Sequence, residues 1–124
     1  MKKTSILLVD DENDVLNSFK AGLGEKGYDV ITTGTGAGAL EILKSKTPDL
    51  IIADLRMQPM NGFDLFQQVK KNPEHAAIPF FFLTAVNDFL AEKYGYKLGV
   101  DAYITKPVDI DNLDALIRDK LSKQ

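Results

Sequence analysis

The sequence contains no cysteine, no excess of basic residues and no long apolar run. The absence of cysteine from all 124 residues excludes a disulfide scaffold, a thiolate metal site and a cysteine nucleophile. Fifteen Lys and Arg stand against 18 Asp and Glu, which gives a formal net charge of −3. Surfaces that bind duplex nucleic acid usually carry a basic excess, so we expect no direct nucleic-acid binding.

The longest apolar run, Ile78–Ala85, has only eight residues, including Pro79 and Thr84. A membrane-spanning helix needs about 20 apolar residues, so no membrane partner is expected. Two lysines follow Met1, but the acidic residues Asp10–Glu12 follow the first apolar run at once, so we expect no signal-peptide hydrophobic region. We therefore expect a cytoplasmic protein.

Length and composition indicate one globular domain over residues 1–124. Hydrophobic residues make up 44% of the chain and charged residues 27%, which is ordinary for a folded protein. A chain of this size buries about two-thirds of its unfolded surface, so it needs no stabilising crosslink.

Short apolar runs alternate with segments of helical periodicity. The apolar runs predict buried strands at Ser5–Val9, Tyr28–Thr33, Leu50–Ala53, Ile78–Leu83 and Ala102–Thr105. The periodic segments predict helices at Asp14–Lys26, Ala37–Lys46, Gly62–Lys71 and Asp88–Leu98, and a last helix that Asp109 caps. This alternation predicts an α/β fold with a doubly wound, five-stranded parallel sheet. The natural strand order is 2-1-3-4-5, that of a flavodoxin-like (βα)5 domain.

Polar residues follow four of the predicted strands. Asp10 and Asp11 follow the first strand, Asp54 the third, Thr84 the fourth and Lys106 the fifth. Parallel strands bring their carboxyl ends to one edge of the sheet, and the predicted order makes these four strands neighbours. We therefore expect the five side chains to meet in one site.

Three carboxylates in one site repel one another unless positive charge is present. Lys106 supplies one positive charge, and Mg²⁺ suits a site of oxygen ligands without His or Cys. Carboxylates, Mg²⁺, a lysine and a hydroxyl together favour phosphoryl chemistry. The only nucleophile in the set is a carboxylate, and Asp54 is the best candidate because it ends the middle strand.

Four motifs resemble the receiver domain of bacterial two-component response regulators. They are LLVDDE (Leu7–Glu12), IIADLRMQPMNG (Ile51–Gly62), FFLTA (Phe81–Ala85) and GVDAYITKP (Gly99–Pro107). The resemblance runs over nearly the whole chain. In the loop that follows the predicted third strand of this sequence, Gln58 stands where the family usually has proline, and Pro59 follows one position later.

The resemblance implies a role for each acidic residue of the site. Asp54 is the expected phosphoacceptor. Asp11, Asp54 and the backbone carbonyl of Arg56 are the expected Mg²⁺ ligands, and Asp10 would hold a metal-bound water.

The resemblance also implies a switch. Lys106 would pair with the phosphoryl oxygens, and its peptide bond to Pro107 is expected to be cis. Thr84 would move toward the phosphoryl group, and Tyr103 would then rotate inward. These movements would change the face formed by the fourth helix, fifth strand and fifth helix.

Partners follow from the same resemblance. The phosphoryl donor would be a sensor histidine kinase or a histidine phosphotransfer protein, and the receiver of the signal would be a downstream output protein or a fused output domain. The resemblance also allows a homodimer that forms on phosphorylation. We expect no enzyme of external metabolites, because the domain would catalyse only its own aspartyl phosphorylation and dephosphorylation.

Two other functions are compatible with parts of the sequence. Gly34–Ala39 fits a G-x-G-x-x-A dinucleotide motif, although that reading leaves Thr84, Lys106 and the acid pair unexplained. A degenerate receiver could instead bind partners without phosphorylation. The one histidine, His75, is expected in a solvated loop rather than in a site.

Overall fold

The computed structural model describes residues 3–85, 93 and 97–122. Its five strands are β1 (Ser5–Val9), β2 (Asp29–Thr33), β3 (Leu50–Asp54), β4 (Phe80–Thr84) and β5 (Ala102–Thr105). All neighbouring strands are parallel, and their order is β2-β1-β3-β4-β5. The predicted doubly wound sheet and its strand order are confirmed.

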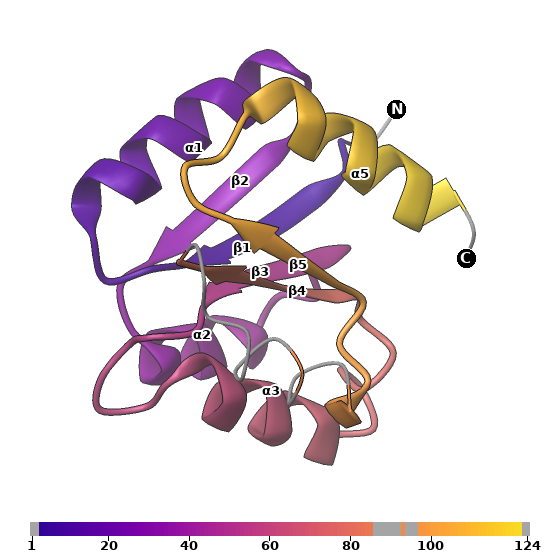
Figure 1. Cartoon of the computed structure of the whole chain (residues 1–124). Coiled ribbons are helices and arrows are strands. Elements are labelled where there is room, and N and C mark those ends of the chain that lie inside the picture. The colour runs from indigo at the N-terminus through magenta and orange to yellow at the C-terminus, as the bar shows by residue number, and fades with distance from the viewer. Residues whose placement is uncertain (1–2, 86–92, 94–96, 123–124) are drawn as a thin grey trace.

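Helices cover both faces of the sheet (Figure 1). Helices α1 (Asn13–Glu25) and α5 (Ile110–Ser122) lie on one face, and α2 (Gly36–Leu43) and α3 (Gly62–Lys71) lie on the other. The predicted helix Asp88–Leu98 falls mostly outside the described residues, although Lys97 and Leu98 are helical. Within the described ranges, no helix combines the length and apolarity that a membrane crossing requires.

The strands alternate their side chains between two apolar cores, one on each face of the sheet. In β4, Phe80 and Phe82 pack toward α3, whereas Phe81 packs in the core that contains Phe19 of α1 and Ile117 of α5. Such continuous apolar strands are typical of parallel sheets that are buried on both faces.

Local side-chain bonds determine where three helices begin. Asn61 Oδ1 accepts from the backbone N–H of Asp64, and Asp64 reciprocates in a capping box that starts α3. Asp109 Oδ1 accepts from the backbone N–H of Asp111 at 2.9 Å, as the sequence predicts for α5. Thr35 Oγ1 accepts from Gly38 N–H at 2.9 Å and caps α2.

Two of the three glycines in Gly34–Ala39 have packing roles in this structure. A Cβ on Gly36 would lie 2.6 Å from Sδ of Met60, and one on Gly38 would lie 2.2 Å from Oγ1 of Thr33. Small residues therefore let α2 approach both β2 and the β3–α3 loop. These contacts account for the glycines without a dinucleotide.

His75 is buried, with 6% of its surface exposed, so the predicted solvated position is wrong. The reason lies in how the chain returns after α3. Nζ of Lys70 donates to the carbonyls of Ala76 and Ile78 at 2.7 and 3.3 Å, which folds this turn back along the helix. The folded turn carries His75 inward beside Val69.

Candidate functional site

The predicted site residues meet at the carboxyl edge of the sheet. Asp54 is the last residue of β3 and Thr84 the last of β4, while Asp10 follows β1 and Lys106 follows β5. The backbone N–H of Lys106 donates to the Thr84 carbonyl at 2.8 Å, and this hydrogen bond aligns the end of β5 with the end of β4.

Lys106 is the centre of the site's charge. Its Nζ lies 3.2 Å from Oδ2 of Asp10 and 3.6 Å from Oδ1 of Asp54. A third carboxylate, Glu12 Oε1, also lies 3.6 Å from this ammonium. Sequence reasoning gave Glu12 no part in the site, although it follows the acid pair directly.

Asp10 is fully buried and incompletely bonded. Its Oδ1 accepts from the backbone N–H of Glu12 at 2.9 Å. Within the described residues, its Oδ2 receives no well-aligned hydrogen bond, despite the nearby ammonium of Lys106. A buried acceptor in this condition is costly, and a cation would relieve the cost.

The electrostatics of the site reflect burial and crowding of like charges. Burial raises the pKa of Asp10 above its usual value, and it raises the pKa of Asp54 as well, with the neighbouring Asp10 carboxylate adding to the effect. Burial opposes the charge of Lys106, but the carboxylates of Asp54 and Asp10 outweigh it and raise its pKa. For all three residues, the raised pKa favours the protonated form, and this lowers the net negative charge of the site.

The acidic residues fit a hard divalent cation. Asp10, Asp11 and Glu12 each offer a carboxylate oxygen, and these oxygens lie within 4.8 Å of one another. Oδ2 of Asp10 also lacks a well-aligned hydrogen bond, and this all-oxygen donor set is the kind that Mg²⁺ takes.

The two residues of the predicted switch lie on β4 and β5. Thr84 is 2% exposed, and its hydroxyl donates to the Ala85 carbonyl at 3.5 Å. Tyr103 is half-buried, and its ring centroid lies 5.6 Å from that of Phe82 on the neighbouring strand. Tyr103 and Leu116 help to line a cavity of about 270 Å³ between β5 and α5.

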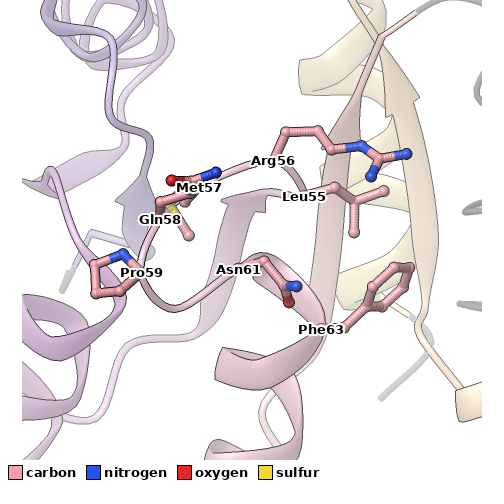
Figure 2. Close-up of a pocket in the computed structure, with 7 residues that line it drawn as sticks. All are labelled: Leu55, Arg56, Met57, Gln58, Pro59, Asn61 and Phe63. Atoms are coloured by element: carbon pink, nitrogen blue, oxygen red, sulfur yellow. The ribbon is translucent and has the colours of Figure 1, made fainter.

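The loop between β3 and α3 borders a second cavity of about 330 Å³ (Figure 2). Arg56 extends over Leu55 in this view, away from Gln58 and Pro59. The backbone N–H of Arg56 bonds to the Asp54 carboxylate. The Gln58–Pro59 and Lys106–Pro107 bonds are both cis, the second as predicted.

Gly62 closes this loop against the end of β3. A Cβ at Gly62 would lie 2.7 Å from the carbonyl oxygen of Asp54 and 2.9 Å from Cα of Leu55. The position of the Asp54 backbone therefore depends on a glycine at the start of α3, a contact that the sequence pattern did not reveal.

Comparison with known proteins identifies relatives of this arrangement. The family described as response regulator receiver domain matches residues 6–118. The "Probable transcriptional regulator ycf27" of Porphyridium aerugineum is 36% identical over 123 residues, which is 99% of this chain and 50% of that protein. Response regulator Rre1 of Synechocystis is 34% identical over 121 residues, covering 97% of this chain and 52% of Rre1. This chain thus spans about half the length of these relatives.

The fold comparison agrees. The signal receiver domain of a signal transduction histidine kinase from Syntrophus aciditrophicus superposes with a TM-score of 0.88 at 32% identity, over 97% of this chain and 91% of that one.

Proposed function

The chain belongs to the response regulator receiver domain family, whose members serve phosphorylation-based two-component signalling, and we propose that its phosphoacceptor is Asp54. The observation that carries this proposal is the Lys106 ammonium, 3.6 Å from Asp54 and 3.2 Å from Asp10 at the sheet edge. At this position the Lys106 ammonium would stabilise the negative charge of an arriving phosphoryl group.

In the proposed reaction, a carboxylate oxygen of Asp54 attacks the phosphorus of a phosphohistidine. The new O–P bond forms as the P–N bond breaks, and the electron pair stays on the imidazole nitrogen, which then takes up a proton. Lys106 stabilises the charge on the phosphoryl oxygens. Asp11, Asp54 and the Arg56 carbonyl would hold Mg²⁺, and Asp10 would hold it through a water. When bound, Mg²⁺ would supply the remaining positive charge.

The proposed response involves Thr84 and Tyr103. Asp54 of β3 pairs with Leu83, the residue before Thr84, so a movement of the Thr84 hydroxyl would bring it toward a phosphoryl group on that neighbouring strand. Tyr103 is one of the residues that line the cavity of about 270 Å³ between β5 and α5, and its response would be a change of the ring's position.

The proposed partners are a sensor histidine kinase or histidine phosphotransfer protein as donor, and an output protein or output domain as the receiver of the signal. The greater length of the relatives, one of which is named a transcriptional regulator, supports the output proposal. The domain would turn over no external metabolite, since its one nucleophile becomes the modified group.

Intact-mass measurement after incubation with acetyl phosphate tests this function. The wild-type protein should gain one phosphoryl group with Mg²⁺ and none with EDTA. Asp54→Asn should gain none, whereas Asp49→Asn, at the opposite end of β3, should behave as wild type. A wild-type protein without a Mg²⁺-dependent adduct would favour the degenerate receiver that binds partners without phosphorylation.

A further inference from the structure

Glu12 stands at the N-cap of α1, where a polar side chain ordinarily accepts from the first free N–H groups of the helix. Among the residues that the structure describes, the Glu12 side chain accepts no such bond. Its Oε1 lies instead 3.6 Å from Nζ of Lys106. The carboxylate of Glu12 is thus directed at the proposed phosphorylation site rather than at its own helix.

The three carboxylates around Lys106 differ in their exposure. The side chain of Asp10 is fully buried and that of Asp54 is 9% exposed, whereas that of Glu12 is 63% exposed. Separating a buried carboxylate from its cation leaves an uncompensated charge and is costly. Releasing an exposed carboxylate to water costs little. The Glu12 contact is therefore the one that Lys106 can give up.

We infer that Glu12 is a positioning residue, which holds the ammonium of Lys106 toward solvent and delays its pairing with a phosphoryl group on Asp54. The inference rests on the proposed function. An incoming phosphoryl group adds anionic acceptors to a site where the ammonium already faces three carboxylates. Lys106 must leave one of them, and Glu12 is the partner that it leaves.

The same carboxylate acts in opposite directions on two ions. Its negative charge helps to attract a divalent cation to Asp10 and Asp11, but it opposes an anionic phosphoryl group and competes for Lys106. Removing the charge should therefore weaken Mg²⁺ binding while it speeds phosphorylation at saturating Mg²⁺. A change that merely loosened the fold would weaken both.

Glu12→Gln tests this inference, with Asp14→Asn as the matched control. Asp14 is an exposed acid in the first turn of the same helix, two residues away. We expect Glu12→Gln to raise the rate of phosphorylation by acetyl phosphate about threefold at saturating Mg²⁺. The free energy of an exposed ion pair corresponds to little more than this fold-change. The Kd for Mg²⁺ of the unphosphorylated protein, measured calorimetrically, should rise by about the same factor.

Asp14→Asn should change neither quantity by more than about a factor of two, because a solvated charge outside the site is largely screened. Far-UV circular dichroism of both variants reports whether α1 is intact. If the wild type is phosphorylated but Glu12→Gln is not faster, the inference is wrong and the proposed function stands. Equal acceleration in Asp14→Asn would also overturn it, because the effect would then be one of general charge. A wild type that takes up no phosphoryl group contradicts both.

Discussion

Asp10 and Asp54 are buried carboxylates that share the single ammonium of Lys106. Their raised pKa values mean that the folded protein holds protons more tightly than the unfolded chain does. The stability that these two carboxyl groups contribute is therefore fully present below the unfolded pKa of about 4, and it is lost as the pH rises through the folded pKa. At pH 7 and without metal, ionisation of the two groups should therefore reduce the stability of the fold.

Asp54→Asn removes one of the two buried charges while it keeps the side chain's size. We expect it to raise the free energy of unfolding by about 1 kcal/mol in EDTA at pH 7, because like charges no longer repel within the site. Urea denaturation of the variant and the wild type measures this difference. The gain should shrink toward pH 4, and Asp14→Asn should show none. A less stable Asp54→Asn would contradict the electrostatic account of the site.

Tyr28 offers a separate test of pH dependence, away from the site. Burial, together with a hydrogen bond of 2.6 Å to Asp114, raises the pKa of Tyr28 to about 12. The unfolded value is about 10, so the stability that this tyrosine contributes is present below pH 10 and is lost as the pH rises to 12.

The absorbance of tyrosinate should therefore include a late titration that Tyr28→Phe removes. In denaturation experiments, the stability of Tyr28→Phe should fall less than that of the wild type between pH 10 and 12. If the difference spectrum between the two proteins titrates near pH 10, burial and the hydrogen bond to Asp114 do not raise the pKa of Tyr28.

At the scale of elements, two glycines at helix positions should respond oppositely to alanine. Gly62 begins α3 in contact with the Asp54 carbonyl, whereas a Cβ on Gly24 in α1 would have no described atom within 4 Å. Gly62→Ala should lower the free energy of unfolding by about 2 kcal/mol through overpacking. Gly24→Ala should raise it by about 0.5–1 kcal/mol, because alanine is the better helix former.

Chemical denaturation of the two variants checks this pair, and phosphorylation by acetyl phosphate supplies a second reading. The contact at Gly62 predicts slower modification of Asp54 in Gly62→Ala and an unchanged rate in Gly24→Ala. Equal stability of the two variants would show that the β3–α3 loop yields to the added methyl group.

The elements also show where sequence patterns suffice. The bounds of α3 and β5 were predicted to the residue, because a cap or a break in the apolar pattern marks each end. Helix α2 ends at Leu43, three residues before the predicted end at Lys46. The sequence predicted the later end because it contains no helix-stopping residue in that stretch before Pro48. The burial of His75 could not be predicted, because it depends on Lys70 bonding to the carbonyls of a later turn.

At the scale of the whole molecule, the meeting of Asp10, Asp54 and Lys106 was predictable because topology alone brings the carboxyl ends of neighbouring parallel strands together. The part played by Glu12 was not, because it depends on a side-chain rotamer at the N-cap of α1. Nor was the approach of Gly62 to Asp54, which depends on the path of a loop. Patterns of polarity predict strand order, but not the contacts that loops and rotamers make.

Metal binding should stabilise the molecule as a whole. A cation that binds only the folded protein adds RT ln(1 + [Mg²⁺]/Kd), or about 2.7 kcal/mol at a concentration of 100 times Kd. The Tm should therefore rise with MgCl₂, and less so in Asp11→Asn, which lacks one proposed ligand. Differential scanning calorimetry measures both, with NaCl of equal ionic strength as the control. A Tm that rises no more in MgCl₂ than in NaCl would exclude a specific site.

Phe82 touches two parts of the molecule that phosphorylation would have to coordinate. Its ring centroid lies 5.2 Å from that of Phe63 in α3 and 5.6 Å from that of Tyr103 in β5. The proposed rotation of Tyr103 would remove one of these two ring contacts, while the contact with Phe63 of α3 would remain. Phe82 thus packs against both β5 and α3, so a substitution at position 82 should alter the packing of both elements together.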